Sequence, residues 1–137
     1  MPFVRICLKQ ERPVGMRRAI ADGVHDALVA TIGIPPDDRF QIIATQGDDL
    51  IYDPGFLGIA RSDGIVMVEV HLSIGRSLDQ KRALYAGIAD RLERLGIRRE
   101  DVFIHLVETT THNWSFGMGA AQYADRAPPH LAQPVPQ

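Results

Sequence analysis

Apolar residues along this chain follow two spacings in turn, and these predict strands alternating with helices. Four short segments are rich in branched apolar residues, as strands are: residues 3–9, 39–46, 64–73 and 101–108. Between the first and second segments, and again between the third and fourth, apolar residues recur every three or four positions, which is the spacing of one helix face. The predicted helices cover residues 14–32 and 77–95. Each half of the chain therefore has the order strand, helix, strand.

Residues typical of helix ends lie at the ends of these segments. Ser77 is a candidate N-cap, since its hydroxyl can accept a hydrogen bond from the first turn. Gly33 and Gly96 follow the two helices, where a left-handed conformation commonly ends a helix. These residues therefore support the helix boundaries predicted from the apolar pattern.

The two halves also repeat in sequence. A shift of 64 residues, or 63 after a one-residue gap, aligns identical residues: Arg12 with Arg76, Gly23 with Gly87, Leu28 with Leu92, Asp38 with Asp101, and Phe40 with Phe103. Identities in one register at such different positions indicate an internal duplication. The two units extend over about 2–46 and 64–108.

A helix between two strands implies a right-handed parallel crossover in each unit. Two such units predict an α+β fold, a four-stranded sheet with both helices on one face. The other face then carries a semi-apolar set of side chains: Met67, Glu69, His71, Phe103, His105 and Val107. A face of this kind favours burial by partner subunits, so we expect a closed oligomer with its sheets facing inward.

Composition limits the remaining possibilities. The 137 residues suit one domain, expected over residues 1–125, and the proline-rich, aperiodic residues 126–137 are expected to be a disordered tail. A net charge of −2 gives no case for nucleic acid or an anionic membrane as partner, and no apolar stretch is long enough to span one. The single cysteine, Cys7, excludes an internal disulfide and suits the cytoplasm.

Pro2 is the candidate with the most distinctive chemistry. It directly follows Met1, and a residue this small allows the initiator to be removed. The mature chain would then begin with a secondary amine at the head of the first strand. Such an amine titrates near neutral pH, and burial or a nearby cation lowers its pKa further. Pro2 would then serve as an acid or a base, whereas with Met1 retained its nitrogen is an amide without basicity.

Three stretches carry a resemblance to a known family. They are Ile34-Pro35-Pro36-Asp37-Asp38-Arg39-Phe40-Gln41, Gly75-Arg76-Ser77 with Gln80-Lys81, and Asn113-Trp114-Ser115-Phe116-Gly117-Met118-Gly119. With Pro2 and the duplication, they resemble the tautomerase superfamily, whose members use an amino-terminal proline, and within it the malonate semialdehyde decarboxylase branch. The resemblance covers residues 1–125.

The resemblance implies a role for each matching residue. Pro2 would supply the acid or base, Asp38 would position or activate water, and Arg76 would hold a substrate carboxylate. A second arginine of the decarboxylase is replaced by Ile74, which weakens the case for decarboxylation. The pocket would be lined by Trp114, Phe116 and Tyr123.

The residues themselves leave simpler alternatives open. Arg76 precedes a helix, where an anion is favoured, but it could be a surface arginine like Arg12. Asp38 and its repeat equivalent Asp101 could both shape a turn. Trp114 and Phe116 could belong to the core or an interface.

The expected function is that of a cofactor-free enzyme acting on a small carboxylate-bearing keto acid or enol, either a tautomerase or a decarboxylase or hydratase. The sequence has no glycine-rich phosphate loop, no Gly-x-Ser-x-Gly motif and no metal-ligand spacing, so we expect no cofactor and no metal. The resemblance implies a homotrimer. The alternative is a non-catalytic trimeric binding protein with a vestigial pocket.

Overall fold

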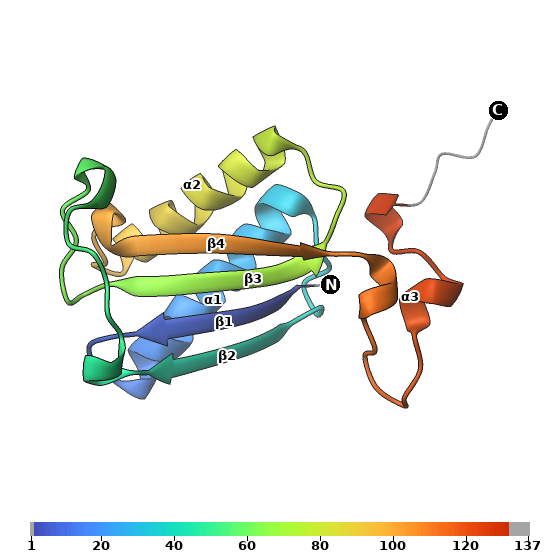
Figure 1. Cartoon of the computed structure of the whole chain (residues 1–137), viewed down its shortest axis with the longest axis horizontal. Helices are drawn as coiled ribbons and strands as arrows, with labels where there is room; N and C mark the ends of the chain where they lie inside the picture. The colour runs from blue at the N-terminus through green and yellow to red at the C-terminus, as the bar shows by residue number, and fades with distance from the viewer. Residues whose placement is uncertain (1, 132–137) are drawn as a thin grey trace.

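A computed structural model describes residues 2–131 and has the predicted order of elements (Figure 1). Its strands and α-helices are β1 (Phe3–Leu8), α1 (Val14–Ile32), β2 (Phe40–Thr45), β3 (Val66–Ser73), α2 (Leu78–Arg94), β4 (Val102–Thr109) and α3 (Gln122–Asp125). The four long strands and two long helices match the segments predicted from apolar spacing. Short 3₁₀ turns occupy parts of the connections, and α3 is a single turn in the C-terminal segment.

The strands form one mixed sheet in the order β2-β1-β3-β4. β1 pairs in parallel with β2, and β3 in parallel with β4, as the crossover argument requires. The two units join through an antiparallel pair at the centre, in which Val4 is opposite Val70 and Leu8 is opposite Val66. Because the central strands run in opposite directions, equivalent ends of the two units lie at opposite ends of the sheet.

Both long helices cover the same face of the sheet, as predicted (Figure 1). Alternate residues of the central strands face the helices and are buried, including Ile6, Leu8, Val68 and Leu72. The helices approach each other at Gly23 and Gly87, the repeat-related glycines, where an added Cβ would meet side chains of the other helix. One apolar layer between the sheet and the helices therefore forms the core.

The helix ends follow the predicted chemistry. Ser77 accepts a hydrogen bond from the Gln80 backbone N–H, and the Gln80 side chain accepts one from the Ser77 backbone, which completes a capping box. Gly33 ends α1 with a φ of 69°, in the left-handed region that glycine tolerates. These caps fix where each helix begins or ends relative to the strands.

The face of the sheet away from the helices is open in the single chain. Phe40, Ile42 and Phe103 are 52%, 46% and 45% exposed on it, and His71 and Glu69 also lie there, paired at 2.5 Å between Nε2 and Oε1. This is the semi-apolar face expected from the strand pattern. Among residues 2–131 no helix is long and apolar enough to cross a membrane.

The C-terminal segment differs from expectation over its first residues. A 3₁₀ turn forms at Pro129–Leu131 and Pro128 is buried, although composition predicted disorder from residue 126. Tertiary contacts with the Gly75 turn supply the order that local composition lacks. Residues 132–137 lie outside the described residues, and the domain boundary at residue 125 stays a prediction.

Candidate active site

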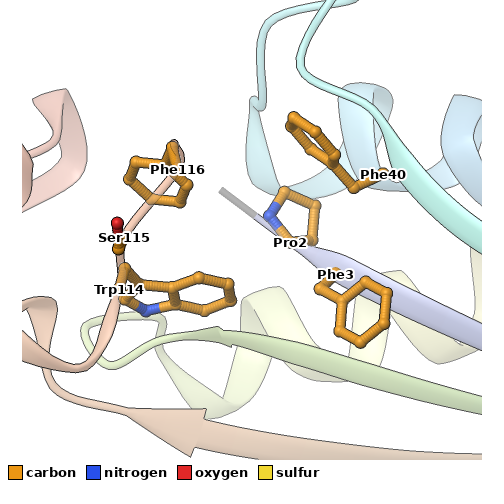
Figure 2. Close-up of a pocket in the computed structure, with 6 residues that line it drawn as sticks. All are labelled: Pro2, Phe3, Phe40, Trp114, Ser115 and Phe116. Atoms are coloured by element: carbon orange, nitrogen blue, oxygen red, sulfur yellow. The ribbon is translucent and has the colours of Figure 1, made fainter. Parts of the chain in front are cut away.

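Pro2 lies at the base of a pocket at one end of the sheet. The pocket has a volume of about 200 Å³ and is lined by Pro2, Phe3, Phe40, Trp114, Ser115 and Phe116. Pro2 itself is buried. Figure 2 shows its ring nitrogen on the side turned toward Trp114 and Phe116, with Phe3 and Phe40 on the other side. The first residue of β1 and the C-terminal segment thus meet, as Figure 1 also shows at the N-terminal end of β1.

Aromatic side chains form the wall of this pocket. The rings of Trp114 and Phe116 stack with centroids 5.6 Å apart, and Phe116 meets Tyr123 edge to face at 4.7 Å. The side chain of Gln122 bridges this loop, since it accepts from the Phe116 backbone N–H and donates to the Gly117 carbonyl. The loop after β4 is therefore held against the sheet end by packing and by its own hydrogen bonds.

Arg76 lies in the short connection between β3 and α2, at the same end of the sheet. Its Nη1 donates to the Ser73 carbonyl at 3.1 Å, and its Nε is buried without a hydrogen-bond partner among the described residues. Burial lowers the pKa of its guanidinium from the ordinary value, while Tyr123, Glu108 and Asp38 act in the opposite direction. A half-buried cation with an unpartnered donor can bind an incoming carboxylate.

Asp38 and Tyr123 belong to the same electrostatic group. Burial raises the pKa of the Tyr123 hydroxyl, with Asp38 adding to the rise and Arg76 opposing it. The backbone N–H of Asp38 donates to the Pro35 carbonyl, which shapes the turn before β2. The polar group of Arg76, Asp38 and Tyr123 thus adjoins the aromatic pocket through the contact of Tyr123 with Phe116.

The six residues proposed from the sequence therefore gather at one end of the sheet, in two adjacent parts. The aromatic part holds Pro2, Trp114 and Phe116, and the polar part holds Asp38, Arg76 and Tyr123. Their roles in a reaction stay predictions. The structure places the buried Pro2 and the partly buried Arg76 at the same end of the sheet.

Several residues of this region were missed by the sequence reasoning. Phe40 and Ser115 line the pocket, and Glu108 acts on Arg76 while it pairs with Lys81, whose Nζ lies 2.5 Å from Oε1. Phe40 could have been found, because it lies in a motif already singled out and at the start of a strand next to Pro2. Glu108 lies in no motif that was singled out. Its place near Arg76 depends on how the end of β4 meets α2.

The repeat-related residues Arg12 and Asp101 lie at the opposite end of the sheet and serve the fold. Asp101 is buried and accepts hydrogen bonds at 2.7 Å from both the backbone N–H and the hydroxyl of Ser62. Arg12 donates to the Gly64 carbonyl at 3.2 Å. The repeated Asp and Arg thus have different partners at the two ends of the sheet. At this end they bind the segment that leads into β3.

The part of the chain that the structure describes holds no group of three or more His, Cys, Asp or Glu side chains placed to bind a metal ion. His130 is a further titratable group on which the charge of Arg76 acts. Burial lowers its pKa from the ordinary value, and the Arg76 charge lowers it further, while a hydrogen bond to the Ile74 carbonyl acts the other way.

Comparisons with known proteins agree with this geometry. Two family models, each described as a tautomerase enzyme, match residues 2–48 and 38–117. The chain is 38% identical over 124 residues to the probable tautomerase YusQ of Bacillus subtilis (strain 168), covering 89% of this chain and 98% of that protein. It is 32% identical over 126 residues to the probable tautomerase YrdN of the same organism, covering 90% and 96%.

Solved structures give the same result. A malonate semialdehyde decarboxylase, FG41, inhibited by 3-bromopropiolate, superposes with a TM-score of 0.85 at 42% identity, over 90% of this chain and 95% of that one. A second malonate semialdehyde decarboxylase, described with decarboxylase and hydratase activities, has a TM-score of 0.83 at 31% identity, over 90% and 96%. A fused 4-OT solved as a symmetric trimer shares the fold at 23% identity, with a TM-score of 0.74 over 90% and 99%.

Proposed function

This chain belongs to the tautomerase family, in its malonate semialdehyde decarboxylase-like branch, and we propose that it is a cofactor-free acid–base enzyme that uses Pro2 on a small keto acid or enol. The observation that carries this proposal is the position of Pro2, buried in an aromatic pocket with its nitrogen turned toward the wall formed by Trp114 and Phe116. Removal of Met1 would turn that nitrogen into a secondary amine. An apolar pocket favours the neutral, basic form of an amine.

Arg76 would bind the carboxylate of the substrate. Its half-buried guanidinium keeps an unpartnered donor, and it lies beside Tyr123, which contacts the aromatic wall of the pocket. A carboxylate held there would place the neighbouring carbons toward Pro2. Binding of the substrate in one orientation accounts for a large part of the rate that such a small site can supply.

With neutral Pro2 the reaction is a tautomerisation. The amine accepts the proton of the enol hydroxyl while the oxygen–carbon double bond forms, and the former alkene carbon takes a proton from the resulting ammonium, so the amine ends neutral. With protonated Pro2 the ammonium would instead polarise a carbonyl or alkene while Asp38 directs a water molecule. That second course gives hydration or decarboxylation, and the decarboxylase and hydratase activities of the 31%-identical relative favour it as a candidate.

The assembly is proposed to be a homotrimer in the cytoplasm. The exposed Phe40, Ile42 and Phe103 on the open face of the sheet are apolar area that neighbouring subunits would cover. A fold relative is described as a symmetric trimer, which makes three copies the first arrangement to test. The lone cysteine suits a reducing compartment.

The test compares ketonisation of phenylenolpyruvate by the wild type and by Pro2→Ala. The purified proteins are first weighed by intact mass, so that only chains lacking Met1 enter the comparison. Pro2→Ala replaces the secondary amine of the rigid ring by a primary amine, and we expect the rate to fall by about a hundredfold, the scale of the contribution of a well-positioned general acid or base. Pro54→Ala, an exposed proline in the connection between β2 and β3, is the matched control and should keep the wild-type rate.

Two results would count against tautomerisation. Equal rates in the wild type and Pro2→Ala, with Met1 absent from both, would show that the reaction does not depend on the secondary amine of proline. No rate at all in the mature wild type would direct the next assay to hydration and decarboxylation of 3-carbon oxoacids. Inactivity there too, with Met1 retained in the native protein, would favour the non-catalytic binding protein.

A further inference from the structure

The C-terminal segment 128–131 packs directly on the turn that carries Arg76. Pro128 is buried, and Nε2 of the His130 ring donates a hydrogen bond to the Ile74 carbonyl at 3.2 Å. Since a carbonyl oxygen only accepts, this Nε2 carries the proton and the ring's Nδ1 is left available. The segment is therefore joined to the residue just before Gly75.

Gly75 is shaped to receive this segment. An added Cβ at Gly75 would lie 2.4 Å from Cδ2 of Leu131 and 3.2 Å from Cδ2 of His130, so only glycine leaves room for the contact. Its φ of +123° also lies in a region that other residues rarely adopt. Two independent features, the missing side chain and the backbone conformation, thus bring the C-terminal segment to the β3–α2 turn.

This packing brings a second titratable group to the cation of the candidate active site. The charge of Arg76 and burial both act on the His130 ring, so the two groups share one electrostatic environment. The other titratable groups gathered there are Tyr123 from α3, Asp38 from the turn before β2, and Glu108 from β4. Ile74 itself offers no charge, and the ring of His130 lies against its carbonyl.

We propose that His130 is a second binding group for the substrate carboxylate, and that it binds by taking up a proton when the carboxylate binds beside Arg76. The proposal rests on the proposed function only in assigning the bound anion as substrate. A proton added to Nδ1 would turn that nitrogen into a donor, while Nε2 keeps its bond to Ile74. The C-terminal segment then belongs to the site and is not a passive tail.

The sign of the pH dependence follows from the charges. In the free protein, burial and then the charge of the neighbouring guanidinium lower the pKa of His130, so both favour its neutral ring. A bound carboxylate favours the charged ring and raises its pKa in the complex. Affinity is therefore higher at low pH and is lost as the pH rises through the pKa of the complex.

The experiment measures binding by calorimetry, from pH 6 to pH 8, with a ligand that cannot react. The ligand is 3-phenylpropanoate, and its amide, 3-phenylpropanamide, is the uncharged control. For the wild type we expect the Kd of the carboxylate to rise by about tenfold across this range, the scale of one charge-assisted hydrogen bond. Repeating each titration in two buffers of different ionisation enthalpy should show proton uptake on binding.

His130→Gln should abolish most of the pH dependence and the proton uptake, while His112→Gln, an exposed histidine of the same loop region, should keep both. An amine at Pro2 would be the same in both variants, so the comparison between them isolates His130. Leu131→Ala removes packing without altering the turn and should weaken carboxylate binding in the same direction as His130→Gln. Gly75→Ala should weaken carboxylate binding more strongly, because its added Cβ would lie 2.4 Å from Cδ2 of Leu131.

Two outcomes would overturn the inference: a His130→Gln variant with the pH dependence of the wild type, or a wild type that binds the amide as tightly as the carboxylate. Failure of the proposed function looks different. A wild type that shows His130-dependent proton uptake on binding 3-phenylpropanoate, yet has no Pro2-dependent ketonisation, would retain the carboxylate site and refute the enzyme activity.

Discussion

Replacement of Asp101 by alanine tests whether the two repeat-related aspartates differ in role, with Asp101 stabilising the fold and Asp38 serving the candidate site. The Asp101 carboxylate is buried and accepts two hydrogen bonds of 2.7 Å from Ser62. A hydrogen bond to a charged group contributes about 1.5–3 kcal/mol, and the substitution would also leave the Ser62 backbone N–H without its acceptor. We therefore expect Asp101→Ala to lower the free energy of unfolding by about 3–5 kcal/mol.

Urea unfolding followed by tryptophan fluorescence at one fixed protein concentration measures this effect. With an m-value of about 2 kcal/mol per M, the midpoint should fall by roughly 2 M. Asp38→Ala is the matched variant, because Asp38 is the repeat equivalent and acts on Arg76 and Tyr123. It should cost less than about 1 kcal/mol in stability and lower the rate of hydration or decarboxylation, the course in which Asp38 directs water, by about a hundredfold. A midpoint for Asp101→Ala within roughly 0.5 M of the wild type would refute the reasoning.

Three further predictions concern the anion site, a helix cap and the open face. Arg76→Lys should raise the KM of a carboxylate substrate by about tenfold with a smaller change in kcat, because an ammonium cannot reproduce the guanidinium's fork of donors; steady-state kinetics would show the split, and an unchanged KM would contradict it. Ser77→Ala removes the hydroxyl of the capping box and should cost about 1 kcal/mol in urea unfolding, whereas Ser115→Ala, outside any helix, gives the baseline. Ile42→Glu places a charge on the open face of the sheet and should convert an assembled protein to monomers in sedimentation velocity; assembly unchanged by it would remove that face as the interface.

The fold was predictable because its local and global patterns agree. Apolar spacing located six elements, and the identity of Arg12 with Arg76 and of Asp38 with Asp101 showed that the second half repeats the first. The strand order needed one more fact, the antiparallel pairing of β1 with β3. That pairing depends on how the two units join, and the spacing of apolar residues within one unit does not reveal it.

The candidate site was predictable only where residues lie in recognisable strings. Pro2, Trp114 and Phe116 were found in this way and line one pocket. His130 was missed, because a proline-rich, aperiodic stretch reads as disordered when its contacts are unknown. The order of that stretch comes from Gly75, some fifty residues earlier in the chain, through a contact that only the folded backbone creates.

The duplication also explains why one end of the sheet can be a reaction site and the other cannot. Both ends have an Asp before an edge strand and an Arg after the central strand of the other unit. At the Asp101 end, Ser62 and Gly64 bond to these side chains, since the chain must continue from β2 into β3 there. At the Asp38 end the corresponding Asp and Arg adjoin the aromatic pocket at Pro2, where we propose that the substrate binds. The proposed chemistry requires a free amine at Pro2, so a variant in which additional residues precede Pro2 should lose Pro2-dependent activity while it preserves the sheet.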